Sequence, residues 1–367
     1  MIKIEDLAGS LKEFRDQGVV NMIPTYFEEK EYRDYDALSQ SFLKRQGKSI
    51  QEIFREVDPD SPHIRMGNIV DDMLSLTDKD FHNKYMVSKA EKPTEKLKLF
   101  IDQVVNISSR EYNNSIFSLG LGIREIIFSR ACQDSDYGKK MKSSTLYSKV
   151  ESFSDYVEEL YQASDKISIT QQEYENALGM VKNMVTSKFT KHYFYTKAEA
   201  LAENKLIVYQ LPIFFKFEGV NCKGLIDMLI VQFNDKGDID WVMPIDFKTT
   251  SRPLLETVPN VLAFRYDIQA YFYTQGLERL LMGVNIKPFK FIFCETIPPD
   301  FNCDVLQVTL SVMEHAEYGN QRNLKGIVEL VNYYKFYQEN GYEVEFDRHR
   351  EDYKEPLKID VENGFIV

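Results

Sequence analysis

The sequence has few cysteines, and their spacing builds no recognisable site. The four cysteines are scattered without a Cys-x-x-Cys pair, which argues against a disulfide scaffold and against a zinc ribbon. No apolar run approaches the roughly 18 residues of a membrane helix, and the amino terminus lacks the basic start and apolar stretch of a signal peptide. Neither a G-x-x-x-x-G-K-S/T phosphate loop nor a G-x-S-x-G elbow is present. We therefore expect a soluble cytoplasmic protein without a membrane segment or a built-in ATPase.

Basic residues are also fewer than acidic residues. The 367 residues include 45 Lys and Arg against 57 Asp and Glu, which gives a formal net charge of −12. Such a chain repels polyanions overall, so contact with nucleic acid would need a local basic surface or metal ions. Hydrophobic residues make up 43% and charged residues 28%, which excludes wholesale disorder and allows a sizeable buried core.

The hydrophobic pattern changes near residue 204. Before it, helical spacing predominates, above all over residues 95–200; after it, runs of β-branched and aromatic residues alternate with turn residues. This order predicts a small α+β sheet behind a helical lobe. The expected strands cover residues 206–217, 225–233, 241–247 and 290–295, and a long helix covers about 258–283. The expected parts are an N-terminal helical segment (1–76), a helical lobe (77–204), a core (205–300) and a C-terminal extension (301–367).

A predicted hairpin brings two acidic residues together. Residues 234–238 (NDKGD) are a turn signal, and a two-residue loop at positions 236 and 237 makes the numbers of facing residues sum to 473. Asp227 and Asp246 are then direct cross-strand neighbours, and Lys248, two residues further on, points to the same face. Opposed carboxylates destabilise a sheet unless positive charge lies between them. Pro244 could introduce a bulge that shifts this register by one residue.

Two carboxylates and a lysine at one spot are what a divalent-metal phosphoryl-hydrolysis site requires. The oxygens hold a hard cation such as Mg²⁺, and the ammonium positions or activates the attacking water and stabilises developing charge. The acid-x-Lys triplet alone is uninformative because it occurs four times; only Asp246-Phe247-Lys248 lies in an apolar strand with an acid across a hairpin. The alternative is a solvated salt-bridge cluster on an exposed sheet face.

The helix after the hairpin carries a polar stripe. Arg265, Gln269 and Tyr273 are four residues apart and therefore share one face. The strand that follows this helix is expected to run parallel to the third strand through a right-handed crossover. This connection places the stripe near the ends of the acidic strands. An ordinary amphipathic helix is the alternative interpretation.

Three short motifs then follow one another in a recognisable order. They are residues 224–227 (GLID), 245–250 (IDFKTT) and 266–273 (YDIQAYFY). The series resembles the G-x-x-D, D-x-K-T-T and Q-x-x-x-Y motifs of the PD-(D/E)xK nuclease superfamily, specifically its RecE-like and RecB-like exonuclease branch. The resemblance implies an α+β (mixed α/β) fold with a restriction-endonuclease-like core, whose mixed sheet is flanked by helices, plus a large helical insertion. It is strong over about 205–296 and weaker over 64–76 and 168–200.

The resemblance also implies a role for each matched residue. Asp227, Asp246 and the Phe247 backbone carbonyl would ligate Mg²⁺ or Mn²⁺, the implied cofactor. Lys248 would activate or position the attacking water. Two residues of the helix would orient the site or touch the DNA strand, namely Gln269 and Tyr273.

Two positions depart from the family pattern. Where relatives often carry a metal-binding histidine, four residues after a glycine, this chain has Asp71, which would complete the metal shell as a hard-metal ligand. Where relatives often carry a glutamate at the start of the first strand, it has Gln210, which cannot supply the negative charge. The number of metals, and activity itself, are therefore open. Glu218 on the same strand is a badly spaced substitute.

A local basic patch offers a landing place for nucleic acid. Lys188, Lys191 and Tyr193 belong to a run of lysines interleaved with aromatic residues, which can hold phosphates and stack bases. With Arg265 they are the expected nucleic-acid contacts. A second basic run covers residues 139–149. A solvated helix face with its aromatic side in the core is the alternative for both runs.

Taken together, the motifs imply a metal-dependent deoxyribonuclease, an exonuclease that acts on DNA ends in recombination or repair and is encoded by a phage or prophage. Its implied partners are DNA and a single-strand annealing protein, and a homo-oligomer is open. One alternative is a catalytically silent nucleic-acid-binding or assembly protein that has kept the fold. Another is a nuclease that cuts flaps, other structures or RNA. The sequence does not separate these, and it does not fix the polarity of digestion.

Overall fold

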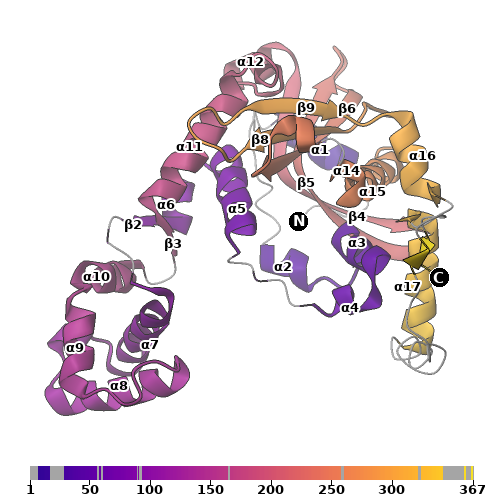
Figure 1. Ribbon diagram of the computed structural model, residues 1–367. Coiled ribbons are helices and arrows are strands. Elements are labelled where there is room, and N and C mark those ends of the chain that lie inside the picture. The colour runs from indigo at the N-terminus through magenta and orange to yellow at the C-terminus, as the bar shows by residue number, and fades with distance from the viewer. Residues whose placement is uncertain are drawn as a thin grey trace. The chain divides into compact units, whose positions relative to one another are not determined.

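The computed structural model describes residues 7–16, 29–55, 58, 61–88, 90, 93–163, 166–257, 260–320, 324–341, 359–360 and 365–366 (Figure 1). The chain forms two compact units, Met1–Gly67 with Lys182–Val367 and Asn68–Val181. We call the first the sheet unit and the second the helical unit. Their borders differ from those expected at residues 76 and 204, because α5 (Pro62–Ser75) and α11 (Gln171–Thr186) each run across a border. No helix within the described ranges is long and apolar enough to cross a membrane.

The sheet unit is built on a seven-stranded mixed sheet, which confirms the predicted mixed α+β class. Its strand order is β1-β5-β6-β8-β9, with β4 paired to β5 and β7 paired to β6. The strands are β1 (Leu38–Ser39), β4 (Lys205–Phe217), β5 (Val220–Phe233), β6 (Ile239–Thr250), β7 (Asn285–Ile286), β8 (Lys290–Glu295) and β9 (Cys303–Gln307). Strands β4, β5 and β6 form an antiparallel meander, and β8 lies parallel to β6, as the crossover rule predicted.

A turn and a bulge together set the register of the hairpin. The turn is wider than predicted: the Gly237 N–H donates to the Asn234 carbonyl at 2.9 Å, and Gly237 takes the positive φ of 81° that glycine adopts easily. Phe233 then faces Ile239, but Gln232 faces Trp241, so one residue of β6 is extra. From there Met228 faces Ile245, which is the predicted sum of 473.

The bulge decides which side chains share a face. Without it, the register of the turn would place Asp227 opposite Ile245 and turn Asp246 to the other side of the sheet. Pro244, the expected source of a bulge, pairs with Leu229 without a shift. The predicted register is therefore confirmed over residues 228–232, although the predicted turn is wrong.

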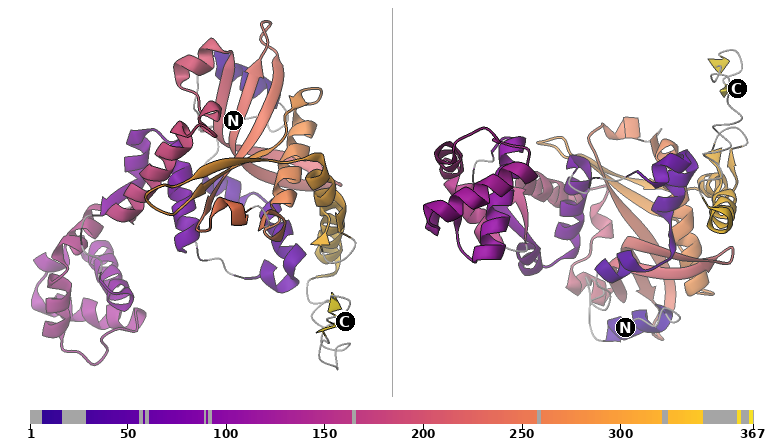
Figure 2. Two further views of the ribbon diagram at one scale, coloured as in Figure 1. Left: turned by 45° about the horizontal axis from the view of Figure 1, so that its top comes forward. Right: turned by 90° about the horizontal axis from the view of Figure 1, so that it is seen from below.

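Helix α15 (Tyr266–Leu280) packs against the sheet (Figure 2), and most of its residues are buried. A methyl group at Gly276 would come 2.7 Å from the Phe215 ring, so the missing side chain lets α15 approach β4 closely. The single long helix predicted over 258–283 is wrong, because α14 (Asn260–Ala263) ends before Arg265, which has a left-handed φ of 55°. Helices α3 (Gln40–Lys48) and α16 (Leu310–Tyr318) contact α15, α17 (Ile327–Asn340) contacts α3 and α16, and α1 (Leu7–Asp16) contacts β4.

The helical unit has a core of its own. It is formed by α7 (Glu95–Tyr112), α8 (Leu121–Asp134), α9 (Ser143–Glu151) and α10 (Ser154–Ala163), whose buried apolar residues pack together. A two-stranded parallel ladder joins β2 (Tyr85–Ser88) to β3 (Ile167–Thr170). The other elements among the described residues are α2 (Glu29–Asp34), α4 (Ile50–Ile53), α6 (Asp78–Lys84), η1 (Ile116–Ser118), η2 (Lys191–Tyr193), α12 (Lys197–Ala202), α13 (Leu254–Thr257), β10 (Gly319–Asn320), β11 (Leu324–Lys325), β12 (Ile359–Asp360) and β13 (Phe365–Ile366).

Candidate active site

Two carboxylates lie on adjacent strands where β5 and β6 separate. The ladder between the strands ends at Met228 and Ile245, and Asp227 and Asp246 are the next residues beyond that pair. Asp246 is only 1% exposed, and Asp227 is partly buried. The Phe247 backbone N–H donates to Asp227 Oδ2 at 2.9 Å, so this carboxylate takes a donor of the neighbouring strand. Both predicted acids are thus brought together.

Lys248 lies on the same face of β6 as Asp246, beside the two acids. Its Nζ forms an ion pair with Asp246 Oδ2. Burial lowers the pKa of Lys248, but the charges of Asp246 and Asp227 outweigh that effect and raise the pKa above its usual range. The ammonium is therefore protonated at neutral pH. In this state Lys248 can donate hydrogen bonds to water or to a phosphate oxygen.

Helix α15 holds the other oxygen of Asp246. Gln269 is buried, and its Nε2 donates to Asp246 Oδ1 at 2.5 Å. Tyr273, one turn further on, is also buried, and its ring lies against the backbone of Gly224, where a methyl group would come within 2.8 Å. This contact explains why residue 224, three positions before Asp227, is a glycine: a larger side chain would clash with the Tyr273 ring. Of the two roles that the resemblance implies for Gln269 and Tyr273, these contacts support orientation of the site.

Arg265 differs from its predicted role. It precedes α15 in the left-handed conformation, so it does not continue the stripe of Gln269 and Tyr273. Its guanidinium is 2% exposed and donates to Asp267 Oδ1 at 3.1 Å and to the Lys325 carbonyl at 2.8 Å. A buried guanidinium that is already paired cannot contact DNA without leaving an unpaired carboxylate behind. Arg265 therefore anchors the start of α15.

Two residues that the sequence analysis missed lie beside Lys248. The Tyr266 ring has the Lys248 Nζ at 5.3 Å from its centroid and the Lys44 Nζ, from α3, at 4.9 Å. Burial and the charge of Lys248 lower the pKa of Lys44 to about 7. Lys44 stands in a charged segment with no motif, and it is more than 200 residues from Lys248 in the chain. No local pattern therefore pointed to it.

The predicted basic patch follows α11 in the sheet unit. Lys188 and Lys191 are exposed, and the Lys188 Nζ lies 4.8 Å from the exposed Phe189 ring. Tyr193 is half-buried. The neighbouring Phe194 ring stacks on Phe247 at 6.0 Å with an interplanar angle of 13°, so this segment packs beside the acidic strands. A nucleic-acid contact by the patch stays a prediction.

Three further positions carry acidic or amide side chains that bear on the metal shell. Asp71 lies on α5 in the helical unit, four residues after Gly67, and its part in a metal shell stays a prediction. Gln210 interrupts β4 with a φ of 48°, between residues that face Met228 and Ile226, so it occupies the register position opposite Asp227. Glu218 lies in the turn at the far end of β4, which makes it unsuitable as a substitute.

The acidic pair fits a single hard cation. Among the residues that the structure describes, no group of three or more His, Cys, Asp and Glu side chains gathers. Mg²⁺, however, commonly takes only one or two carboxylates and keeps several waters. Asp246 Oδ2 is buried and makes no well-aligned hydrogen bond, apart from its ion pair with Lys248, so it has lone pairs to spare. Asp227, Asp246 and a backbone carbonyl are a chemically suitable set.

Comparison with known proteins does not establish a function, so the functional argument depends on the residues of the candidate site. No protein-family model matches the chain, and no curated protein matches it. Among solved structures, it is similar to the crystal structure of a protein from Eubacterium rectale described as a candidate exonuclease. The TM-score is 0.34 at 11% identity, over 80% of this chain and 79% of that chain. Resemblance at this level is a weak likeness of fold.

Proposed function

We propose that the protein is a divalent-metal-dependent nuclease that hydrolyses phosphodiester bonds of DNA. The observation that carries the proposal is the convergence of Asp227, Asp246 and Lys248, with Gln269 holding the buried acid. A purely structural ion pair has no physical need for a second carboxylate from the next strand. Buried, charge-coupled groups of this kind are typical of functional sites.

In the proposed mechanism, each side chain has a distinct task. Asp227, Asp246 and the Phe247 carbonyl would hold one Mg²⁺ or Mn²⁺, which when bound supplies positive charge at the phosphate and acidifies water. Lys248, which is protonated, donates to the attacking water or to a phosphate oxygen and offsets the negative charge that develops in the transition state. Gln269 restricts the Asp246 carboxylate to one orientation. The proton released by the water would pass to solvent or to a phosphate oxygen of the substrate.

The finer assignments rest on the motif resemblance. It favours an exonuclease that works on DNA ends in recombination or repair, in a phage or prophage setting, with a single-strand annealing protein as partner. Action on flaps or on RNA and assembly into a homo-oligomer are open. Circular and linear duplexes of the same sequence separate exonuclease from endonuclease action.

A second candidate function is nucleic-acid binding without catalysis. The observation in its favour is Gln210, a neutral residue at the register position opposite Asp227. A glutamine there removes one negative charge from the place where a further cation would be held. The two candidates differ in a simple measurement, because only a nuclease consumes its substrate.

The test is digestion of end-labelled linear duplex, single-stranded and flapped DNA with Mg²⁺ or Mn²⁺ and with chelator. We expect metal-dependent release of label by the wild-type protein and its loss in Lys248→Ala. A matched control is Lys205→Ala, which removes a lysine from another acid-x-Lys triplet, where Lys205 pairs with Glu203. Absence of wild-type cleavage on every substrate would contradict the nuclease proposal and favour the binding protein.

A further inference from the structure

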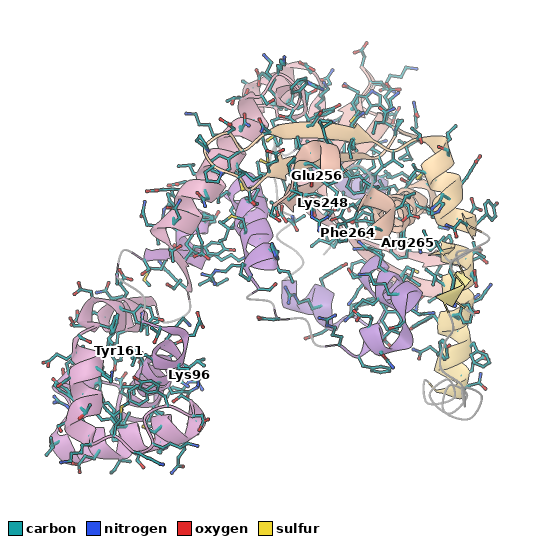
Figure 3. All side chains as sticks on the ribbon, in the orientation of Figure 1. Lys96, Tyr161, Lys248, Glu256, Phe264 and Arg265 are labelled. Atoms are coloured by element: carbon teal, nitrogen blue, oxygen red, sulfur yellow. The ribbon has the colours of Figure 1, made fainter. Side chains whose placement is uncertain are left out.

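A pocket with three cations adjoins the candidate active site. It has a volume of about 450 Å³ and is lined by Ser41, Lys44, Arg45 and Lys48 of α3 and by Phe264. All five residues belong to the sheet unit. Figure 3 labels Phe264, which precedes α15, and Lys248 on β6. We refer to this feature as the α3 pocket.

Among the described residues, no carboxylate forms an ion pair with the cations of the α3 pocket, although the charges of Asp246 and Asp267 act on Lys44. Within that part of the chain, Lys44, Arg45 and Lys48 form no ion pair, and the buried Arg45 Nε has no hydrogen-bond partner. Lys44 and Lys48 are one helical turn apart, a spacing at which like charges repel. Burial and the neighbouring charges of Lys248 and Lys48 lower the pKa of Lys44, and they outweigh the opposing charges of Asp246 and Asp267. An anion in the pocket would remove this repulsion and provide a partner for Arg45.

One wall of the pocket is aromatic. Phe264 is 46% exposed, although it is a large apolar side chain, and its ring centroid lies 5.7 Å from that of Tyr266. Exposed aromatic rings beside lysine and arginine are the usual means of holding single-stranded nucleic acid, since the cations bind phosphates and the rings stack on bases. A free inorganic anion would use the cations but would leave Phe264 without a function.

Tyr266 connects the pocket to the catalytic lysine. The ammonium groups of Lys44 and Lys248 both lie about 5 Å from its ring centroid, at 4.9 and 5.3 Å. A strand with one phosphate at Lys248 therefore has a further cationic position close by, at Lys44. This proximity ties the α3 pocket to the reaction rather than to an unrelated ligand.

We propose that the α3 pocket holds a backbone phosphate of the nucleic-acid strand, close to the phosphodiester at Lys248, while Phe264 packs against a base. The proposal rests on the proposed nuclease function, because the strand whose phosphate the pocket binds is the substrate of that nuclease. It predicts that Arg45 and Lys48 contribute to strand affinity through charge and that Phe264 contributes through stacking. These two contributions differ in their dependence on salt.

The test is equilibrium binding of a fluorescent oligonucleotide at several salt concentrations, with Asp246→Asn in every protein to prevent cleavage. The double substitution Arg45→Ala, Lys48→Ala is expected to weaken binding about tenfold or more and to reduce the slope of log K against log salt by about 0.7 for each phosphate that the protein no longer neutralises. Phe264→Ala should weaken binding without changing the slope. The control pair Lys216→Ala, Lys236→Ala removes two exposed lysines from β4 and the hairpin turn and should change affinity less than twofold.

Each outcome decides between the two proposals. Equal losses of affinity in the Arg45/Lys48 variant and in the control pair, or an unchanged salt slope, would overturn the α3 pocket while leaving the nuclease proposal intact if the wild type cleaves DNA. A wild-type protein that neither binds nor cleaves nucleic acid would overturn both. If the double variant proves unstable, Lys48→Glu alone, at an exposed position of α3, should also weaken binding of the oligonucleotide.

Discussion

The chain carries the same triplet, an acid followed by any residue and a lysine, in two regions with contrasting surroundings. At Glu203-Asn204-Lys205 the glutamate side chain is 52% exposed, and the lysine, which is 11% exposed, pairs with it at 2.5 Å and donates to the Tyr195 hydroxyl at 2.8 Å. At Asp246-Phe247-Lys248 the aspartate is 1% exposed and is held from both sides. The difference lies outside the triplet: only Asp246 has a second acid across the ladder and a glutamine from a packed helix. A three-residue motif becomes a site through its neighbours in space.

The largest expected difference between the two regions is in catalysis. Lys248→Ala should lower the rate of metal-dependent DNA cleavage by about a hundredfold to a thousandfold, because it removes a charged donor at the position where negative charge develops. Lys205→Ala should leave the rate within about twofold, because this lysine pairs with Glu203 and Tyr195 and not with the acidic pair. Initial rates on linear duplex at equal protein concentration measure both. Equal losses of rate in the two variants would contradict the claim that Lys248, and not Lys205, belongs to the catalytic site.

The second difference concerns the free energy of unfolding. Asp246→Ala leaves the Lys248 ammonium and the Gln269 amide without the carboxylate that binds them, and it should destabilise the protein by about 3 kcal/mol. Glu203→Ala removes a solvent-screened partner and should cost less than about 1 kcal/mol. Urea denaturation at one pH compares the two. Similar small effects would mean that the Asp246 pair is a solvated surface pair.

The packing behind the site gives a third way to sharpen the comparison. Gly224→Ala places a methyl group 2.8 Å from the Tyr273 ring and should cost about 1–3 kcal/mol by overpacking, with loss of activity as α15 shifts. Gly122→Ala, in α8, meets nothing within 4 Å and should be neutral or stabilising by up to about 1 kcal/mol. Thermal unfolding and cleavage rates of both variants provide the measurement. A tolerated Gly224→Ala would contradict the close contact.

A further expected effect is a dependence of the free energy of unfolding on pH. The pKa of Lys44 is about 7 in the folded chain against an ordinary 10.5, so between these values the unfolded chain holds one proton more. Stability should therefore rise with pH over this window, and Lys44→Met should flatten the rise. Denaturation midpoints from pH 7 to pH 10 check the sign. A midpoint that falls more steeply in the wild type than in Lys44→Met would contradict the lowered pKa of Lys44.

The sheet around the site could be predicted because its signals are local. Apolar strands, a turn signal and the period of two placed Asp227 opposite Asp246 and put Lys248 on the same face. The register prediction succeeded through two compensating features, since the five-residue loop at 234–238 and the extra residue of β6 cancel in the sum. Hydrogen bonds of Asn234 with the turn, at 2.9 and 3.0 Å, are what make the wider loop stable.

Other features depend on contacts between distant parts of the chain. Arg265 has helical spacing in sequence, yet its guanidinium is fixed by Asp267 and by a carbonyl at residue 325, which holds it in a left-handed conformation before the helix. The partnership of Lys44 with Tyr266 joins segments more than 200 residues apart. Periodicity describes one element at a time, so it carries no information about such pairs.

The most direct test of the central claim is a double-mutant cycle on DNA cleavage with Asp246→Asn, Lys248→Ala and the two combined. If the two residues act as one catalytic unit, the double variant should be no slower than the worse single variant, because the second substitution has nothing further to remove. The same cycle with Lys205→Ala in place of Lys248→Ala should leave the rate of Asp246→Asn unchanged. Losses of rate in Asp246→Asn and Lys248→Ala that simply multiply would show that the residues act independently and would contradict the site described above.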